Sequence, residues 1–303
     1  MTQPTSVNMT FDTSLVDVNP PRVDESDSTL DLQQQQQQQT PTSSAPPVQH
    51  VPTQDAYDQW AAIYDTDGNM LQAIDDLELA SLLPCFLASV ASAASTSRSG
   101  SSKDEVSVLD LGCGTGRNMM KILGYDWCSS SSSSSSSSRR VNVIGLDFSQ
   151  KMLDIAAGKL AVLMQDKTST TTSTTSPIPA SLQNLPPVDA AISTLVLEHI
   201  PLPAFFATLT AVLRRGGMAL VTNMHEDMGR VSQAGFLNEE GVKVRGSSFV
   251  YSVGETVGAA REAGFEVVRV VERGDGEGGC GGGEGGGKGG QVGWGEGVVW
   301  GCC

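Results

Sequence analysis

Basic residues are scarce in this sequence of 303 residues, which has 19 lysines and arginines against 34 aspartates and glutamates. The formal net charge of -15 provides no positive patch of the kind that binds nucleic acid or an anionic membrane surface. We therefore expect neither nucleic acid nor a membrane as a partner. An acidic protein of this kind favours small molecules or basic groups as substrates.

Long apolar runs and targeting signals are also missing. No apolar run approaches the length of a membrane-spanning helix, and the N-terminus has neither the basic region nor the apolar core of a secretion signal. Acidic residues close to the N-terminus argue against a mitochondrial transit peptide: Asp12, Asp17, Asp24 and Glu25. We expect a cytoplasmic protein, with a nuclear location also open.

Cysteines with metal-binding or redox spacing are absent. The six cysteines are spread along the chain, with no C-x-x-C pair and no nearby histidine at ligand spacing. This distribution predicts reduced thiols and no metal site.

Low-complexity stretches leave room for only one sizeable core. Residues 1–54 include seven consecutive glutamines followed by a mixture of Pro, Ser and Thr, and we expect them to form a disordered tail. Insertions of similar composition are expected near 129–138, 166–180 and 274–297. The sequence thus predicts a single domain over 55–303, interrupted by these insertions.

One stretch, VSVLDLGCGTGRNMM at 106–120, indicates how a ligand is bound. An aliphatic run ends at three alternate glycines, Gly112, Gly114 and Gly116, and a helix is predicted to begin at Arg117. A strand, a glycine turn and a helix in this order present backbone N–H groups to a nucleotide-like ligand. The G-x-G-x-x-G fingerprint of dinucleotide folds does not fit, because Arg117 stands where its third glycine is required.

The same stretch resembles the D-x-G-x-G-x-G signature of the class I S-adenosylmethionine (SAM) dependent methyltransferases, beginning at Asp110. The resemblance implies an α/β fold with a Rossmann-like, seven-stranded and mostly parallel sheet and helices on both faces. Its last strand would be antiparallel, and is expected at 298–300. The resemblance also implies that SAM is the cofactor and that four residues of the signature bind it: Asp110, Gly112, Gly114 and Gly116.

A second block, Y-D-x-W-A-x-x-Y-D from Tyr57, resembles the N-terminal lid of the methyltransferases related to the ubiquinone, menaquinone and biotin-pathway enzymes. In those families the segment closes over the cofactor. The resemblance implies that Tyr64 contacts SAM, with a core role as the alternative, and we expect Tyr57 to contact the acceptor. The helical spacing that follows predicts that Met70, Ile74 and Leu77 pack on the sheet.

Asp147 ends a predicted strand, VNVIGLD, and is the expected ribose acid. Without the serine run at 129–138 it would follow the glycine turn at the distance that nucleotide folds use for this acid. A carboxylate is suited to the task because its two oxygens can accept from both ribose hydroxyls. The resemblance places Met152 against the adenine, with a core role as the alternative.

The residue expected to bind the adenine amino group differs from the family pattern. Many family members have an aspartate that binds it, whereas this sequence has Ser181 in that position. Three alternatives follow: Gln183 or Asn184 substitutes, the backbone near Leu182 holds the ring alone, or adenine binding is weaker than usual.

Polar residues follow the predicted fourth and fifth strands, at the edge where open α/β sheets bind ligands. His199 follows the fourth strand, and Asn223 and His225 follow the fifth. We expect an acceptor pocket between the lid, Tyr57 to Asn69, and this edge, with Asn223 in contact with the acceptor.

Together these blocks predict a SAM-dependent methyltransferase that moves a methyl group to an oxygen, nitrogen or sulfur atom of a small molecule. A base is needed only if the attacking atom still carries its proton. His199 and His225 are the candidates, because an unperturbed imidazole has a pKa of about 6.5. The competing hypothesis is a SAM-binding regulatory or scaffold protein without turnover, which the substituted adenine position and the insertions leave open.

Overall fold

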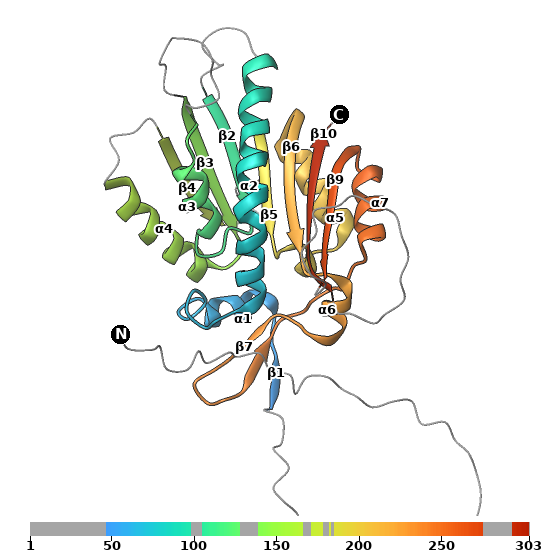
Figure 1. Ribbon diagram of the computed structural model, residues 1–303. Helices are drawn as coiled ribbons and strands as arrows, with labels where there is room; N and C mark the ends of the chain where they lie inside the picture. Colours follow the sequence, from blue (N-terminus) through green and yellow to red (C-terminus); the bar gives the residue numbers. More distant parts are fainter. Residues whose placement is uncertain are drawn as a thin grey trace, which may run out of the picture.

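The computed structural model describes residues 47–97, 105–127, 139–165, 171–177, 182, 185–274 and 293–302. Its main element is a seven-stranded sheet in the order β4-β3-β2-β5-β6-β10-β9 (Figure 1). The strands are β2 (Glu105–Leu111), β3 (Arg140–Asp147), β4 (Thr171–Pro177), β5 (Val188–Thr194), β6 (Leu213–Asn223), β9 (Phe265–Gly274) and β10 (Gly293–Cys302). β10 runs antiparallel to both β6 and β9, and the other pairs are parallel. The predicted sheet, with its last strand antiparallel, is confirmed.

Helices cover both faces of this sheet. One apolar cluster joins it to α2 (Met70–Ser97), α3 (Arg117–Gly124) and α4 (Gln150–Gln165), and a second joins it to α5 (Leu202–Val212) and α7 (Val253–Glu262). In β2, Val106 and Val108 belong to the first cluster, and Leu109 and Leu111 to the second. A strand buried on both faces has a nearly continuous apolar sequence, which is why VSVLDL could be recognised as one.

Helix α2 corrects the prediction that no apolar run approaches the length of a membrane-spanning helix. By length and composition, its segment Met70–Ala94 is long and apolar enough to cross a membrane. One side of this helix is buried in the core of the domain: Leu79, Leu83, Phe86, Leu87, Val90, Ala91 and Ala94. Its apolar character is therefore accounted for by packing on the sheet.

Met70, Ile74 and Leu77, the α2 residues that were predicted to pack on the sheet, do not form its buried side. Leu77 is 75 % exposed, whereas Leu79 is 1 % exposed. Two residues correspond to about 200° around a helix, so these side chains point in opposite directions. Met70 and Ile74 are half-buried and line cavities beside the sheet instead.

The folded part of the chain begins before the boundary predicted at residue 55. β1 (Val48–His50) pairs in parallel with β8 (Lys243–Arg245), β8 pairs in antiparallel fashion with β7 (Gly235–Leu237), and α1 (Thr53–Trp60) follows β1. These short pairs are made by backbone groups, which composition does not reveal. The remainder of the predicted tail, 1–46, lies outside the described residues.

Two of the three predicted insertions overlap strands. β4 lies within the insertion predicted at 166–180 and pairs with β3, and β10 begins at Gly293, inside the predicted glycine-rich loop, and includes 298–300. Thr favours extended backbone, and β4 has only one neighbour in the described sheet, so this strand lacks the apolar run of a central strand. The serine run at 129–138 and the rest of the glycine-rich loop lie outside the described residues.

Several small elements gather at the carboxyl ends of the parallel strands (Figure 1). The short helices η4 (Leu197–His199) and α6 (Glu226–Val231) follow β5 and β6 there. A third apolar cluster joins α1 and the small sheet to α4: Ala56, Trp60, Ala61, Met152, Phe236 and Val244. Since open α/β sheets bind ligands at this edge, α1 and the small sheet cover its functional side.

Candidate functional site

The turn between β2 and α3 places three glycines in the left-handed region, with φ of 75° at Gly112, 52° at Gly114 and 83° at Gly116. A Cβ on Gly112 would lie 2.2 Å from Cγ2 of Val196, and one on Gly116 would lie 3.1 Å from Cβ of Ala156. Packing therefore requires these two glycines. At Gly114 no described residue lies within 4 Å of that position, so a ligand can approach its backbone closely.

Asp147 ends β3 and connects this strand to the glycine turn. Its Oδ2 accepts a hydrogen bond from the Gly114 backbone N–H at 2.9 Å, and its Oδ1 accepts one from the Ser149 backbone N–H at 2.8 Å. The residue is 5 % exposed, and burial raises the pKa of its carboxyl group to about 6 although both N–H groups lower it. Each oxygen keeps a further lone pair for a ribose hydroxyl.

Asp110, near the end of β2, is a buried carboxyl group without a hydrogen-bond partner among the described residues. Burial raises its pKa to about 7, although the Arg117 guanidinium lowers it. Arg117 itself is bound to Asp75 and Asp76 of α2, each at 2.5 Å. A buried acceptor of this kind fits a ligand that brings positive charge or hydrogen-bond donors.

The lid, Tyr57 to Asn69, consists of the second half of α1 and the turn that follows it, and side-chain contacts hold it against the glycine turn. Asp58 Oδ1 accepts a hydrogen bond from the Ser149 hydroxyl at 2.5 Å, and Asp65 Oδ1 accepts one from the Thr115 hydroxyl at 2.7 Å. Thr115 belongs to the turn, and Ser149 follows Asp147 by two residues. The lid therefore covers the predicted cofactor site, as the resemblance implies.

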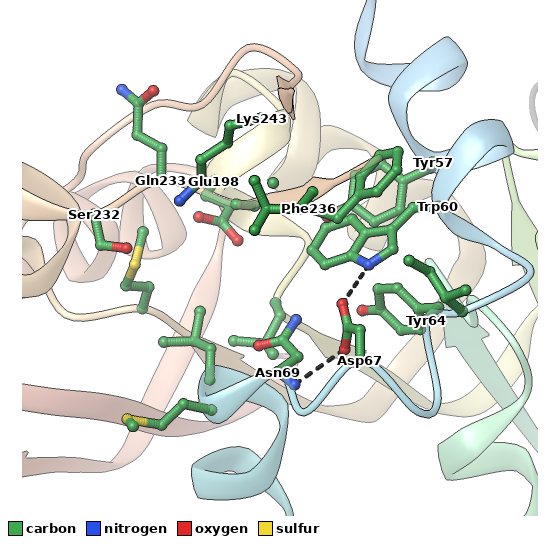
Figure 2. Close-up of a pocket in the computed structure, with 18 of the residues that line it drawn as sticks. Tyr57, Trp60, Tyr64, Asp67, Asn69, Glu198, Ser232, Gln233, Phe236 and Lys243 are labelled. Carbon is green, nitrogen blue, oxygen red and sulfur yellow. Dashed lines mark hydrogen bonds between the residues drawn. The ribbon is translucent and has the colours of Figure 1, made fainter. Parts of the chain in front are cut away.

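A cavity of about 440 Å³ lies between the lid and the carboxyl ends of β5 and β6 (Figure 2). Aromatic rings form much of its wall: Tyr57, Trp60 and Tyr64 of the lid and Phe236 of β7. The rings of Trp60 and Phe236 stack with their centroids 5.5 Å apart, and Trp60 Nε1 donates to Asp67 Oδ2 at 2.5 Å. A volume of this size accommodates a small molecule.

Tyr57 and His199 form a hydrogen-bonded pair at this cavity. The Tyr57 hydroxyl lies 2.7 Å from Nε2 of His199, and Nδ1 of His199 lies 3.0 Å from the carbonyl oxygen of Ser247. A carbonyl oxygen only accepts, so Nδ1 carries the proton and Nε2 accepts from Tyr57. Burial lowers the pKa of His199 and raises that of Tyr57. Tyr57 lines the cavity, whereas His199 is not among the residues that line it.

Asn223 and His225 lie beside the cavity and not in its wall. Asn223 is buried, and its Oδ1 accepts a hydrogen bond from the Glu198 backbone N–H at 3.3 Å. Nδ1 of His225 accepts from the Asp227 backbone N–H at 3.2 Å and so caps α6. The cavity lies at the edge where the acceptor is expected, but Met224, between the two selected residues, is the one that lines it.

The residues predicted to bind the adenine or contact the cofactor have different surroundings. Met152 is fully buried among the apolar residues under the lid, which supports its core alternative. Leu182 is half-buried and packs against the second core cluster, and Gln183 lies outside the described residues. Tyr64 lines the cavity, with its ring centroid 5.0 Å from that of Trp60.

Glu198 is the main residue of the site that sequence reasoning did not select. It is 1 % exposed, lines the cavity, and its Oε2 has no hydrogen-bond partner among the described residues. Burial raises its pKa to about 8. The signal for it is an acidic residue within an apolar run, LVLEHI at 195–200, directly after a predicted strand.

These features together define a class of protein. A glycine turn leads from the second strand of the chain into a helix, an acid ends the next parallel strand, and the sheet has one antiparallel strand beside β6. This is the arrangement that the resemblance implies for a seven-stranded methyltransferase. A lid and a small-molecule cavity complete it at the expected edge.

Comparisons with known proteins give the family. The methyltransferase domain family matches residues 109–219. An uncharacterized methyltransferase of Emericella nidulans is 38 % identical over 234 residues, which cover 73 % of this chain and 78 % of the relative. The chain belongs to the class I SAM-dependent methyltransferases.

Solved structures with a similar fold include the magnesium protoporphyrin IX methyltransferase of Synechocystis PCC 6803 with bound S-adenosylhomocysteine (SAH). It has a TM-score of 0.45 and 14 % identity, and the match covers 83 % of this chain and 95 % of that chain. A SAM-dependent methyltransferase of Methanosarcina mazei has a TM-score of 0.45 and 13 % identity, covering 66 % and 93 %. Similarity at this level does not transfer a substrate.

SAM is the cofactor of this enzyme, and the residues of the site fit it. Gly114 leaves its backbone open to a ligand, and Asp147 keeps lone pairs for a ribose. Asp110 supplies a buried carboxyl group with no hydrogen-bond partner among the described residues, which would complement the positive charge that SAM carries. These are three of the residues that the sequence predicts for cofactor binding.

Proposed function

We propose that this enzyme moves the methyl group of SAM to an oxygen, nitrogen or sulfur atom of a small molecule bound in the lid cavity. The position of the cavity is the observation that supports this most strongly. It lies at the carboxyl ends of β5 and β6, under the lid that also contacts Thr115 of the glycine turn. In open α/β sheets the cofactor and the substrate meet at this edge.

The protein's contribution to the reaction is alignment and the exclusion of water. When bound, SAM supplies an electrophilic methyl group, and the acceptor's lone pair bonds to its carbon while the carbon–sulfur bond breaks and leaves its electron pair on sulfur. Charge is discharged in this step, so positioning matters more than strong charge stabilisation. The aromatic side chains of the lid form part of the cavity wall. The Tyr57 hydroxyl donates to His199, so its oxygen can accept a hydrogen bond from the acceptor.

This function predicts that the purified protein converts SAM to SAH when alcohols, amines and thiols are supplied as a library. The product is measured by mass spectrometry. Gly114→Val is the inactive control, because its side chain would occupy the open space at a backbone φ that valine rarely adopts. Absence of turnover in a folded wild-type protein that binds SAM would favour the alternative, a SAM-binding regulatory or scaffold protein.

Tyr57 and His199 are expected to act as one unit. Tyr57→Phe and His199→Ala should each lower kcat by about tenfold, since each removes the hydrogen bond between them. The double variant should lose no more than either single variant. His225→Ala should keep kcat, because its ring caps α6 outside the cavity. Steady-state kinetics at saturating SAM measures this, and independent, multiplying losses would contradict the pairing.

We also propose a likeness to the ubiquinone, menaquinone and biotin-pathway enzymes, which the lid block supports. The acidic composition supports a cytoplasmic location and argues against nucleic acid and membranes as partners.

A further inference from the structure

The lid cavity contains a carboxylate oxygen for which the described protein offers no partner. Among the residues that line the cavity, three carry charge: Glu198, Asp67 and Lys243. Asp67 accepts hydrogen bonds from Trp60 Nε1 at 2.5 Å and from the Asn69 backbone N–H at 3.0 Å (Figure 2). Oε2 of Glu198 has no such bond among the described residues, although the residue is only 1 % exposed.

His199 does not neutralise Glu198. Its Nε2 lies 3.7 Å from Oε1 of Glu198. That nitrogen accepts a hydrogen bond from the Tyr57 hydroxyl, and burial lowers the pKa of the imidazole. His199 is therefore neutral. A buried carboxylate without a partner is costly, so burial raises the pKa of Glu198 to about 8 and the group ionises most readily when a cation is bound beside it. In a ligand cavity, the missing partner is then supplied by the ligand.

The rest of the wall also suits a cation. The rings of Tyr57, Trp60 and Tyr64 lie next to one another, with centroids 5.6 Å apart for Tyr57 and Trp60 and 5.0 Å apart for Trp60 and Tyr64. Phe236 adds a fourth ring, and Figure 2 shows Glu198 at the same cavity as these rings. Aromatic faces attract cations, and more strongly where water is excluded.

We propose that the methyl acceptor is a small amine, bound as its ammonium ion with Glu198 as the counter-ion and the aromatic rings around it. This inference rests on the proposed function and names the class of its substrate. Glu198 takes a proton from the ammonium at Oε2, which frees the nitrogen lone pair that attacks the methyl carbon. An anionic acceptor would face Glu198 and Asp67, whereas Lys243 is the one basic residue among those lining the cavity.

Three probes of similar shape and different charge test the proposal on SAH-saturated full-length protein. They are 2-phenylethylamine, which is protonated at neutral pH, the neutral 2-phenylethanol, and the anionic phenylacetate. Binding is followed by ligand-observed NMR and by intrinsic tryptophan fluorescence, to which Trp60 of the cavity wall contributes. We expect the amine to bind at least tenfold more tightly than the alcohol, and phenylacetate to bind most weakly.

Glu198→Gln keeps the shape of the side chain and removes its charge. This variant should bind the amine and the alcohol within about twofold of each other, with unchanged affinity for the alcohol and for SAH. Glu239→Gln, the same change at an exposed position, should keep the wild-type ranking. The wild-type ranking by itself remains a test if Glu198→Gln does not fold.

Several outcomes would overturn the proposal. They are equal binding of amine and alcohol, no binding of any probe at millimolar concentration, and an amine preference that survives in Glu198→Gln. A loss of SAH affinity in Glu198→Gln would assign the residue to the cofactor instead. The turnover assay separates this proposal from the proposed function. If only alcohols or thiols are methylated, the amine is not the acceptor, but the protein is still a small-molecule methyltransferase. A charge preference without turnover would refute the function and leave the amine site.

Discussion

Replacing Asp147 by alanine should weaken SAM binding by about a hundredfold or more. The carboxylate is expected to accept two charge-assisted hydrogen bonds from the ribose, each contributing about 1.5 to 3 kcal/mol, and about 1.4 kcal/mol corresponds to a factor of ten. The substitution also removes the acceptor for the Gly114 and Ser149 backbone N–H groups. Isothermal titration calorimetry with SAM measures the loss directly.

A matched control separates the ribose contact from a general charge effect. Asp154→Ala removes the same charge from an exposed position on α4, and should leave SAM affinity unchanged. If folded Asp147→Ala protein binds SAM as tightly as the wild type does, Asp147 is not the ribose acid.

The pH dependence of binding gives the same assignment a second readout. Burial raises the pKa of Asp147 to about 6, so the carboxyl group is ionised and accepts hydrogen bonds above this pH, and is protonated below it. Affinity for SAH should therefore fall as the pH decreases through about 6. Asp110, with a pKa raised to about 7, titrates in both wild type and Asp147→Ala. The Asp147 charge helps to raise the pKa of Asp110, so the variant should lose the step near pH 6 and shift the Asp110 step to lower pH.

Replacing Trp60 by alanine should lower the free energy of unfolding by about 3 to 5 kcal/mol, the range for deleting a buried tryptophan. Trp60 is 3 % exposed and packs against Phe236, and its indole N–H is bound to Asp67. In a domain of this size the expected fall in melting temperature is roughly 6 to 20 °C. Differential scanning calorimetry measures it.

This loss of stability should be concentrated at the lid, because Trp60 lies in the third apolar cluster and not in the two clusters that cover the sheet. Hydrogen exchange of the α1 amides should accelerate more than that of β2. Leu77→Ala is the control: it also shortens a large apolar side chain, but one that is 75 % exposed, so its effect should stay within about 0.5 kcal/mol. Equal destabilisation by the two changes would show that the lid is not packed as described.

Two strands show why composition misplaced parts of the fold. β1 and β4 lie in sequence that is rich in polar residues and was assigned to a tail and to an insertion. Both pair through backbone hydrogen bonds with one neighbour in the described sheets, β1 with β8 and β4 with β3. Such a strand needs no apolar run on both faces, so hydrophobic pattern carries little information about it.

The candidate site shows the same division between local and distant information. By itself the sequence determined the glycine turn and Asp147, because each is positioned by the strand that immediately precedes it. Only the tertiary structure decided that Tyr57 reaches His199, 142 residues later, and that Oε2 of Glu198 is buried at a cavity with no hydrogen-bond partner among the described residues. Those relations depend on how the lid, η4 and the small sheet pack together. Packing between segments distant in the chain leaves no periodic signal in any one of them.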